Sequence, residues 1–138
     1  MSDNITGGCL CGQMQYECVG EPLFTGNCHC HACQKSTGGA YAPELFFTES
    51  AVSVFGDFKV YERKGDSGKS VWQHFCPNCG TWVYSRVEVL PDIIGILAGT
   101  LSDTSRYQPQ VDIFTDSATY WNAMNPSLPK FGRMPPKG

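Results

Sequence analysis

The chain has few charged residues and no large excess of either sign. Charged side chains make up 17% of its 138 residues, the formal net charge is -3, and no basic run occurs. Nucleic-acid-binding proteins carry basic patches, so the composition argues against a nucleic-acid partner. No stretch approaches the roughly 20 apolar residues of a membrane span. Residues 1–12 also contain no apolar segment of signal-peptide length. We therefore expect a cytoplasmic protein without a membrane association.

Helical periodicity is also scarce. A helix is predicted only for a turn or two after Cys30 and around Ala118–Ala123. Apolar and polar residues alternate instead, as at Met14, Tyr16 and Cys18, which is typical of a half-buried strand. Further strands are predicted at Glu44–Thr48, Val52–Phe55, Lys59–Arg63, Val71–Phe75, Trp82–Val87, Ile93–Ala98 and Val111–Phe114.

This pattern predicts an all-β fold in one domain. A length of 138 residues suits a single domain, and no repeat or linker divides residues 1–138. The tail over residues 125–138 carries four prolines, and we expect it to run extended over the surface or to fray.

Cysteine, by contrast, is abundant, with eight in the chain. Structural disulfides are rare in a reducing cytoplasm, so metal binding is the favoured interpretation, and a secreted disulfide scaffold is the alternative. The spacings agree with metal binding, because seven of the cysteines fall into a pair, a triplet and a second pair, with Cys18 alone.

The most specific short motif is CPNCG at Cys76–Gly80. Two thiolates at this spacing can bind one zinc, with Pro77 fixing one φ angle and Gly80 allowing the positive φ that closes the turn. A redox pair has the same spacing, but it is expected in a βαβ context, which the sequence lacks. The motif supplies two zinc ligands, so a second pair must come from elsewhere.

Cys9 and Cys11 are predicted to be that second pair. If the segment from Cys9 is extended, these two side chains face one side, and Cys18 faces the other with Met14 and Tyr16. Cys18 is then a small buried hydrophobic residue. A four-thiolate site is closed and structural, and this one would join segments more than sixty residues apart.

The remaining triplet is Cys28, Cys30 and Cys33. Three protein ligands with one open position are the arrangement of a catalytic zinc site. The alternative is a site closed by a histidine, for which the candidates are His29, His31 and His74. Cys28 and Cys30 on one face would leave His29 pointing away, and His74 shares a face with Cys76 and could support the first metal.

Three thiolates around zinc leave a net negative charge, so bound water is acidified less and hydrolysis is not favoured. Zinc accepts sulfur readily, and a coordinating thiol is deprotonated. The triplet therefore predicts a site that holds a small thiol as thiolate for attack on an electrophile. Lys35 and the adjacent Ser36–Gly39 could bind an anionic substrate.

Three segments resemble the family of the glutathione-dependent formaldehyde-activating enzyme, whose domain centromere protein V shares. They are GGCLCGQMQY (Gly7–Tyr16), CHCHACQKSTGG (Cys28–Gly39) and FCPNCGTWV (Phe75–Val83). The resemblance implies a β-tent, an all-β fold of small sheets around zinc. It implies two Zn²⁺ per chain, a structural one on Cys9, Cys11, Cys76 and Cys79 and a catalytic one on Cys28, Cys30 and Cys33.

The implied activity is that of a zinc-dependent carbon–sulfur lyase that combines glutathione with formaldehyde, or a related aldehyde, to form an S-hydroxymethyl adduct. The alternative is a non-catalytic, zinc-stabilised binding module. The family often carries a His-Ile pair on a late strand, where this chain has Asp112 and Ile113. Residues that line the substrate pocket therefore differ from the family pattern. The residues that end the family pattern are present in this chain and are Trp121, Leu128, Pro129 and Phe131.

Overall fold

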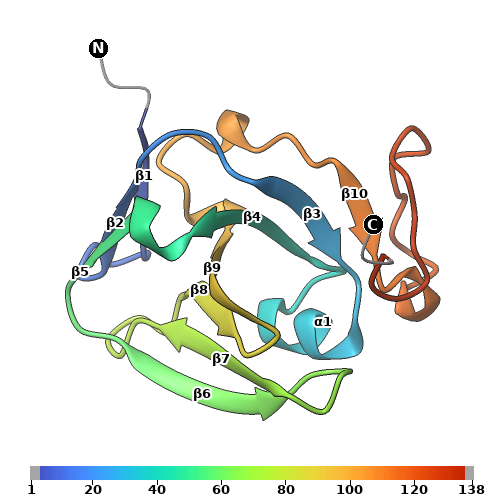
Figure 1. The fold of residues 1–138 in the computed structure, drawn as a ribbon, viewed down its shortest axis with the longest axis horizontal. Coiled ribbons are helices and arrows are strands. Elements are labelled where there is room, and N and C mark those ends of the chain that lie inside the picture. Colours follow the sequence, from blue (N-terminus) through green and yellow to red (C-terminus); the bar gives the residue numbers. More distant parts are fainter. Residues whose placement is uncertain (1–3, 136–138) are drawn as a thin grey trace.

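A computed structural model describes residues 4–135, in which ten strands form two sheets and a single α-helix is present (Figure 1). The prediction of an all-β fold is confirmed. A three-stranded antiparallel sheet has the order β1-β2-β5, formed by Ile5–Gly8, Gln15–Cys18 and Val52–Phe55. A seven-stranded sheet has the order β10-β3-β4-β9-β8-β7-β6. Its strands, in that order, are Val111–Ile113, Phe24–Cys28, Ala42–Thr48, Leu90–Leu97, Trp82–Val87, Ser70–Phe75 and Lys59–Lys64.

The larger sheet is antiparallel except where β10 pairs parallel with β3. It curls, so that β3, β4 and β10 lie along one side and β6 and β7 along the other, with α1 between them (Figure 1). The helix α1 covers His31–Thr37 and contacts β4. Ser36 on this helix also exchanges hydrogen bonds with Gln73 of β7. The helix therefore lies on the concave face of the sheet.

Two apolar cores result from this arrangement. The main core fills the space between the two sheets, with Tyr16 and Cys18 from one sheet against Leu45 and Ile96 from the other. A smaller core on the concave face contains Cys28, Cys33, Ala42, Leu97 and Ile113. Alternate residues of β4 thus contribute to opposite cores, as strand geometry requires.

The helix predicted at Ala118–Ala123 is wrong. A 3-10 turn at Thr115–Ser117 is followed by irregular chain. Within the predicted range, a backbone bond from the Asn122 amide to the Thr119 carbonyl, 3.4 Å, closes a single turn. Ala118, the first residue of the predicted range, has φ −59° and ψ 142°, which is not a helical conformation, so no helix begins there.

The described part of the tail, residues 125–135, lies against β10 (Figure 1). The Asp112 amide donates to the Pro129 carbonyl at 3.0 Å, and the Phe131 amide donates to the Asp112 carbonyl at 3.0 Å. Residues 136–138, the end of the predicted proline-rich tail, lie outside the described residues. None of the helices formed within residues 4–135 is long and apolar enough to cross a bilayer.

Candidate functional site

All eight cysteines have free thiols, and seven of them form two groups. The first group is Cys9, Cys11, Cys76 and Cys79, whose sulfur atoms all lie within 4.8 Å of one another. The Cys9 and Cys11 sulfurs are 3.6 Å apart, and the Cys11 and Cys76 sulfurs are 3.7 Å apart. Four sulfurs placed tetrahedrally at 2.3 Å from zinc would be separated by about 3.8 Å. The donor set and its spacing therefore fit a closed zinc site.

The second pair of this group forms the turn that its motif predicts. The Cys76 sulfur accepts hydrogen bonds from the amides of Asn78 and Cys79 at 3.4 and 3.5 Å. Gly80 has φ 78° and donates its amide to the Cys76 carbonyl at 2.9 Å. Hydrogen bonds to Cys79 from the hydroxyl and the backbone of Thr81 lower the pKa of the Cys79 thiol to about 5. Such amide and hydroxyl donors favour the thiolate form that a metal requires.

Cys9 and Cys11 do lie beside the second pair, but their local conformation differs from the predicted one. Residues 9–14 form a turn rather than an extended strand, with the Cys9 amide donating to the Met14 carbonyl at 2.9 Å. Strand parity therefore does not explain why Cys9 and Cys11 converge; the turn does. Cys18 lies in β2, fully buried in the main core and in neither cysteine group.

The second group is Cys28, Cys30 and Cys33, whose sulfurs also lie within 4.8 Å of one another. Cys28 ends β3, Cys30 is the N-cap of α1, and Cys33 is in the first turn of that helix. The Cys33 amide donates to the Cys30 sulfur at 3.3 Å. Within residues 4–135, no histidine or carboxylate joins these three sulfurs. This donor set fits a zinc with three protein ligands and one open position.

The histidines considered as a fourth ligand have other surroundings. His29 is buried, and its Nε2 lies 2.8 Å from Asp112 Oδ1. His31 is exposed at the start of α1. The Nδ1 of His74 lies 3.1 Å from the Trp72 carbonyl oxygen, and its ring stacks on Tyr84 with centroids 4.2 Å apart.

The three thiols of the second group titrate as a unit. Hydrogen bonds from Cys28 and Cys33 hold the pKa of the Cys30 thiol far below its usual value. The same contacts, together with burial, raise the pKa of Cys33. Without metal, negative charge therefore concentrates on Cys30, the ligand nearest to solvent.

A pocket of about 360 Å³ opens beside Cys30. Its wall includes Arg63 and Lys64 from the end of β6, which hydrogen-bond the neutral groups of Gln73 and Ser70. Neither cation forms an ion pair with a carboxylate in the described chain. Lys35, a candidate for binding an anionic substrate, is exposed and is not among the lining residues. Sequence reasoning missed Arg63 and Lys64 because only the curl of the sheet brings β6 close to α1.

The pocket also contains the opposite charge. Arg133 binds both Asp66 carboxylate oxygens at 2.9 Å, so these two residues neutralise each other. Asp116 lines the pocket from the chain after β10. The pocket therefore offers two free cations and a carboxylate beside a sulfur cluster.

Asp112, the departure from the family pattern, lies behind the three-cysteine group. Its side chain accepts hydrogen bonds from Asn27 at 3.1 Å and Lys130 at 3.2 Å, in addition to its contact with His29. Burial alone would raise the pKa of this carboxyl, but these three contacts outweigh it and hold the pKa below its usual value. Asp112 thus connects the segment between two of the cysteines to β10 and the tail.

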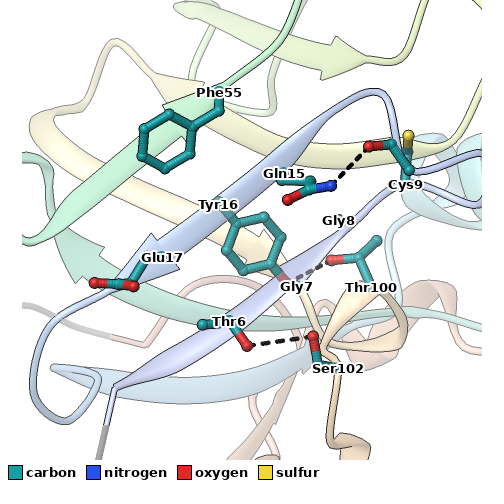
Figure 2. Close-up of a pocket in the computed structure, with 11 residues that line it drawn as sticks. Thr6, Gly7, Gly8, Cys9, Gln15, Tyr16, Glu17, Phe55, Thr100 and Ser102 are labelled. Atoms are coloured by element: carbon teal, nitrogen blue, oxygen red, sulfur yellow. Dashed lines mark hydrogen bonds between the residues drawn. The ribbon is translucent and has the colours of Figure 1, made fainter. Parts of the chain in front are cut away.

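A larger pocket, about 540 Å³, lies on the three-stranded sheet (Figure 2). Figure 2 shows Tyr16 hydrogen-bonded to Thr100, at 2.7 Å, and Thr6 to Ser102, at 3.3 Å, along its floor. Its single charged lining residue is Glu17, and it contains none of the three cysteines at α1. It is therefore poorly suited to an anionic thiol.

Comparisons with known proteins agree with the geometry. Residues 4–117 match the family described as "Glutathione-dependent formaldehyde-activating enzyme". No curated protein is significantly similar to the chain in sequence. Among solved structures, a crystal structure of a Rhodobacter sphaeroides protein superposes with a TM-score of 0.56 at 19% identity. The match covers 91% of this chain and 98% of that one, and at this identity it shows a shared fold.

Proposed function

Because the chain belongs to the glutathione-dependent formaldehyde-activating enzyme family, we propose that it is a zinc-dependent carbon–sulfur lyase. The proposed substrates are glutathione and formaldehyde, or a related aldehyde, and the product is the S-hydroxymethyl adduct. The sulfur of glutathione bonds to the carbonyl carbon, and the thiol proton ends on the carbonyl oxygen. The reverse reaction follows the same path.

The observation that carries the proposal is the convergence of three sulfurs with no fourth protein ligand in the described chain. Cys28, Cys30 and Cys33 would hold the catalytic zinc, and Cys9, Cys11, Cys76 and Cys79 the structural one. Zinc bound by three thiolates supplies a soft acceptor that lowers the pKa of an entering thiol. Eight free thiols suit the reducing cytoplasm, which is the proposed location.

The charges of the pocket beside Cys30 support glutathione as the thiol. Glutathione carries two carboxylates and one ammonium group. Arg63 and Lys64 line the pocket and would bind the carboxylates, and Asp116, which also lines it, would bind the ammonium. A neutral thiol would leave these charges unused, so the pocket favours a zwitterionic peptide thiol.

Cobalt-substituted protein provides the test, because cobalt–thiolate bands report the ligands of the metal. Glutathione titrated into this protein is expected to change the bands with a stoichiometry of one per chain. S-methylglutathione, which has the same charges but no thiol, is the matched control and should not change them. The enzyme proposal would be overturned, and the binding module favoured, by either of two results. One is a second metal whose bands no added thiol changes, and the other is a second metal that already has a histidine nitrogen as its fourth ligand.

A further inference from the structure

Glu44 projects from the middle of β4 onto the face of the sheet that carries the three-cysteine group. Its neighbour Leu45 packs into the main core, whereas Ala42, two residues before it, packs with Cys28 and Cys33. Residues two apart on a strand share a face. In the register of β3 and β4, Ala42 lies directly opposite Cys28. Glu44 is therefore a diagonal neighbour of Cys28, a separation of about 7 Å that a long side chain can cover.

This carboxyl group is buried and has no hydrogen-bond partner in the described chain. Glu44 is 9% exposed, and no donor to its carboxylate is found among residues 4–135. Buried carboxylates are normally paired or hydrogen-bonded, because an unsatisfied one is costly. The oxygens of Glu44 are not fully enclosed, so this nearly buried acid, which has no protein partner among residues 4–135, is open to a ligand beside the three-cysteine group.

The neighbouring strand leaves room around this carboxyl group. Gly95 of β9 lies under it, and a Cβ at that position would be 3.5 Å from Glu44 Oε1 and 3.0 Å from the Phe46 ring. Any larger side chain there would press on the carboxyl group. Glycine at this position therefore leaves space beside the Glu44 carboxyl group.

The titratable and charged groups around Glu44 come from four parts of the chain. They are Cys28 on β3, Cys30 and Cys33 at α1, Arg63 on β6, and Tyr107. Burial raises the pKa of the Glu44 carboxyl, and Arg63 opposes this rise. A carboxyl group on the face of the sheet that carries the reacting sulfur can both accept and donate a proton.

We propose that Glu44 is a further catalytic residue of the thiol site, whose carboxyl group hydrogen-bonds the oxygen of the carbonyl substrate and exchanges a proton with it. This inference rests on the proposed function. In the forward direction the carboxylate takes the thiol proton, the sulfur–carbon bond forms as the carbonyl π bond opens, and the carboxyl returns the proton to oxygen. In reverse, the carboxylate takes the hydroxyl proton as the carbon–sulfur bond breaks and formaldehyde leaves, and the carboxyl then returns the proton to the sulfur. No other acid, base or oxidant is needed.

The test measures breakdown of the adduct, prepared from glutathione and formaldehyde, by exchange NMR on zinc-loaded protein at one fixed pH, with the rate of spontaneous breakdown subtracted. Glu44→Gln should lose about 100-fold or more of the rate, the usual contribution of a proton-transfer group. The matched control, Glu17→Gln on the other sheet, should behave as wild type.

Infrared spectroscopy gives a second readout, independent of turnover. Wild-type protein should show a carboxyl or carboxylate band that shifts when the adduct binds, and Glu44→Gln should lack it. A band that the adduct leaves unchanged overturns the proposal even if the variant does not fold. Full activity in Glu44→Gln overturns the role of Glu44 alone. Wild-type protein that neither binds thiol nor accelerates breakdown overturns the proposed function, and the role of Glu44 with it.

Discussion

At the scale of single residues, the two buried acids beside the three-cysteine group differ in their partners. Asp112 is 1% exposed and has Asn27, His29 and Lys130 as partners, so its charge is stabilised within the fold. Glu44 is 9% exposed and has none in the described chain. A satisfied buried charge serves structure, whereas an unsatisfied one costs stability and persists where function requires it.

Because the Glu44 carboxylate lowers the stability of the folded protein, its replacement by a neutral side chain is predicted to be stabilising. Its pKa is raised in the folded protein, from 4.5 to about 8, so the folded state holds the proton more tightly than the unfolded chain. The resulting stability is present below the unfolded pKa and is lost as pH rises through about 8. Glu44→Gln, which stays neutral, should therefore gain about 3.5 kcal/mol of stability relative to wild type between pH 5 and pH 8.

Urea unfolding of zinc-loaded protein at the two pH values measures this difference. The Glu17→Gln control should show no such pH dependence. An equal free energy of unfolding for wild type and Glu44→Gln at both pH values would contradict the prediction.

Cys18 supplies a test of the division of the cysteines. It is fully buried in the main core and belongs to neither group. Cys18→Ala should keep both metals and lose about 1 kcal/mol of stability, because it deletes one small buried group. Elemental analysis with urea unfolding measures both quantities. Release of a zinc by this variant would show that the seven-residue ligand set is wrong.

At the scale of elements, local motifs were predictable and long-range juxtapositions were not. Val52–Phe55 and Trp82–Val87 were predicted with the observed bounds, because each alternates and ends at a turn. Strand β3 was missed, since Gly26 and Asn27 interrupt its apolar pattern although both lie inside the sheet. Strand β1, Ile5–Gly8, was missed as well, because two glycines end it.

The candidate site shows the same division. The spacing within each cysteine pair and within the triplet is local, and a closed zinc site needs four ligands, so the two groups could be predicted, even though the strand argument for Cys9 and Cys11 was wrong. Arg63, Lys64 and Glu44 come from β6 and β4, and only the register and curl of the sheet place them near α1. No sequence spacing encodes that arrangement.

Substitution of ligands should separate the two cysteine groups. Cys76 and Cys79 join the end of β7 to the turn after β1, so losing one ligand releases that connection. Cys76→Ser should lose most of the 5 kcal/mol or so that keeps a small domain folded. Cys33→Ser should remain folded with a weakened second site. Circular dichroism with elemental analysis distinguishes the two, and a folded Cys76→Ser protein carrying two zinc ions would refute the structural assignment.

The contacts of Asp112 predict that the tail and the three-cysteine group are coupled. Asp112→Asn keeps the shape of the side chain but removes the charge that Lys130 and His29 face. Breaking a buried ion pair in this way should cost about 3 kcal/mol. Asp92→Asn on exposed chain is the control and should be close to neutral. Urea unfolding measures the loss, and equal stability of the two variants would mean that Asp112 does not anchor the tail.

At the scale of the whole molecule, the seven-stranded sheet separates two cysteine groups with different surroundings. The four-cysteine group packs at the edge of the main core, between the two sheets. The three-cysteine group lies in the smaller core on the concave face, beside a pocket. Metal lost from the second centre would therefore leave the main core intact.

This separation predicts two zinc ions that are bound with unequal affinity. The closed site has four protein sulfurs, whereas the other has three and an open position, so it should release its metal first. A chelator added stepwise should remove one zinc per chain without changing the circular dichroism spectrum, and removal of the second should coincide with unfolding. Glutathione present during the titration should delay the first step, because a ligand that binds the loaded site stabilises it. Simultaneous loss of both ions, or unfolding with the first, would contradict the assignment of separate structural and catalytic centres.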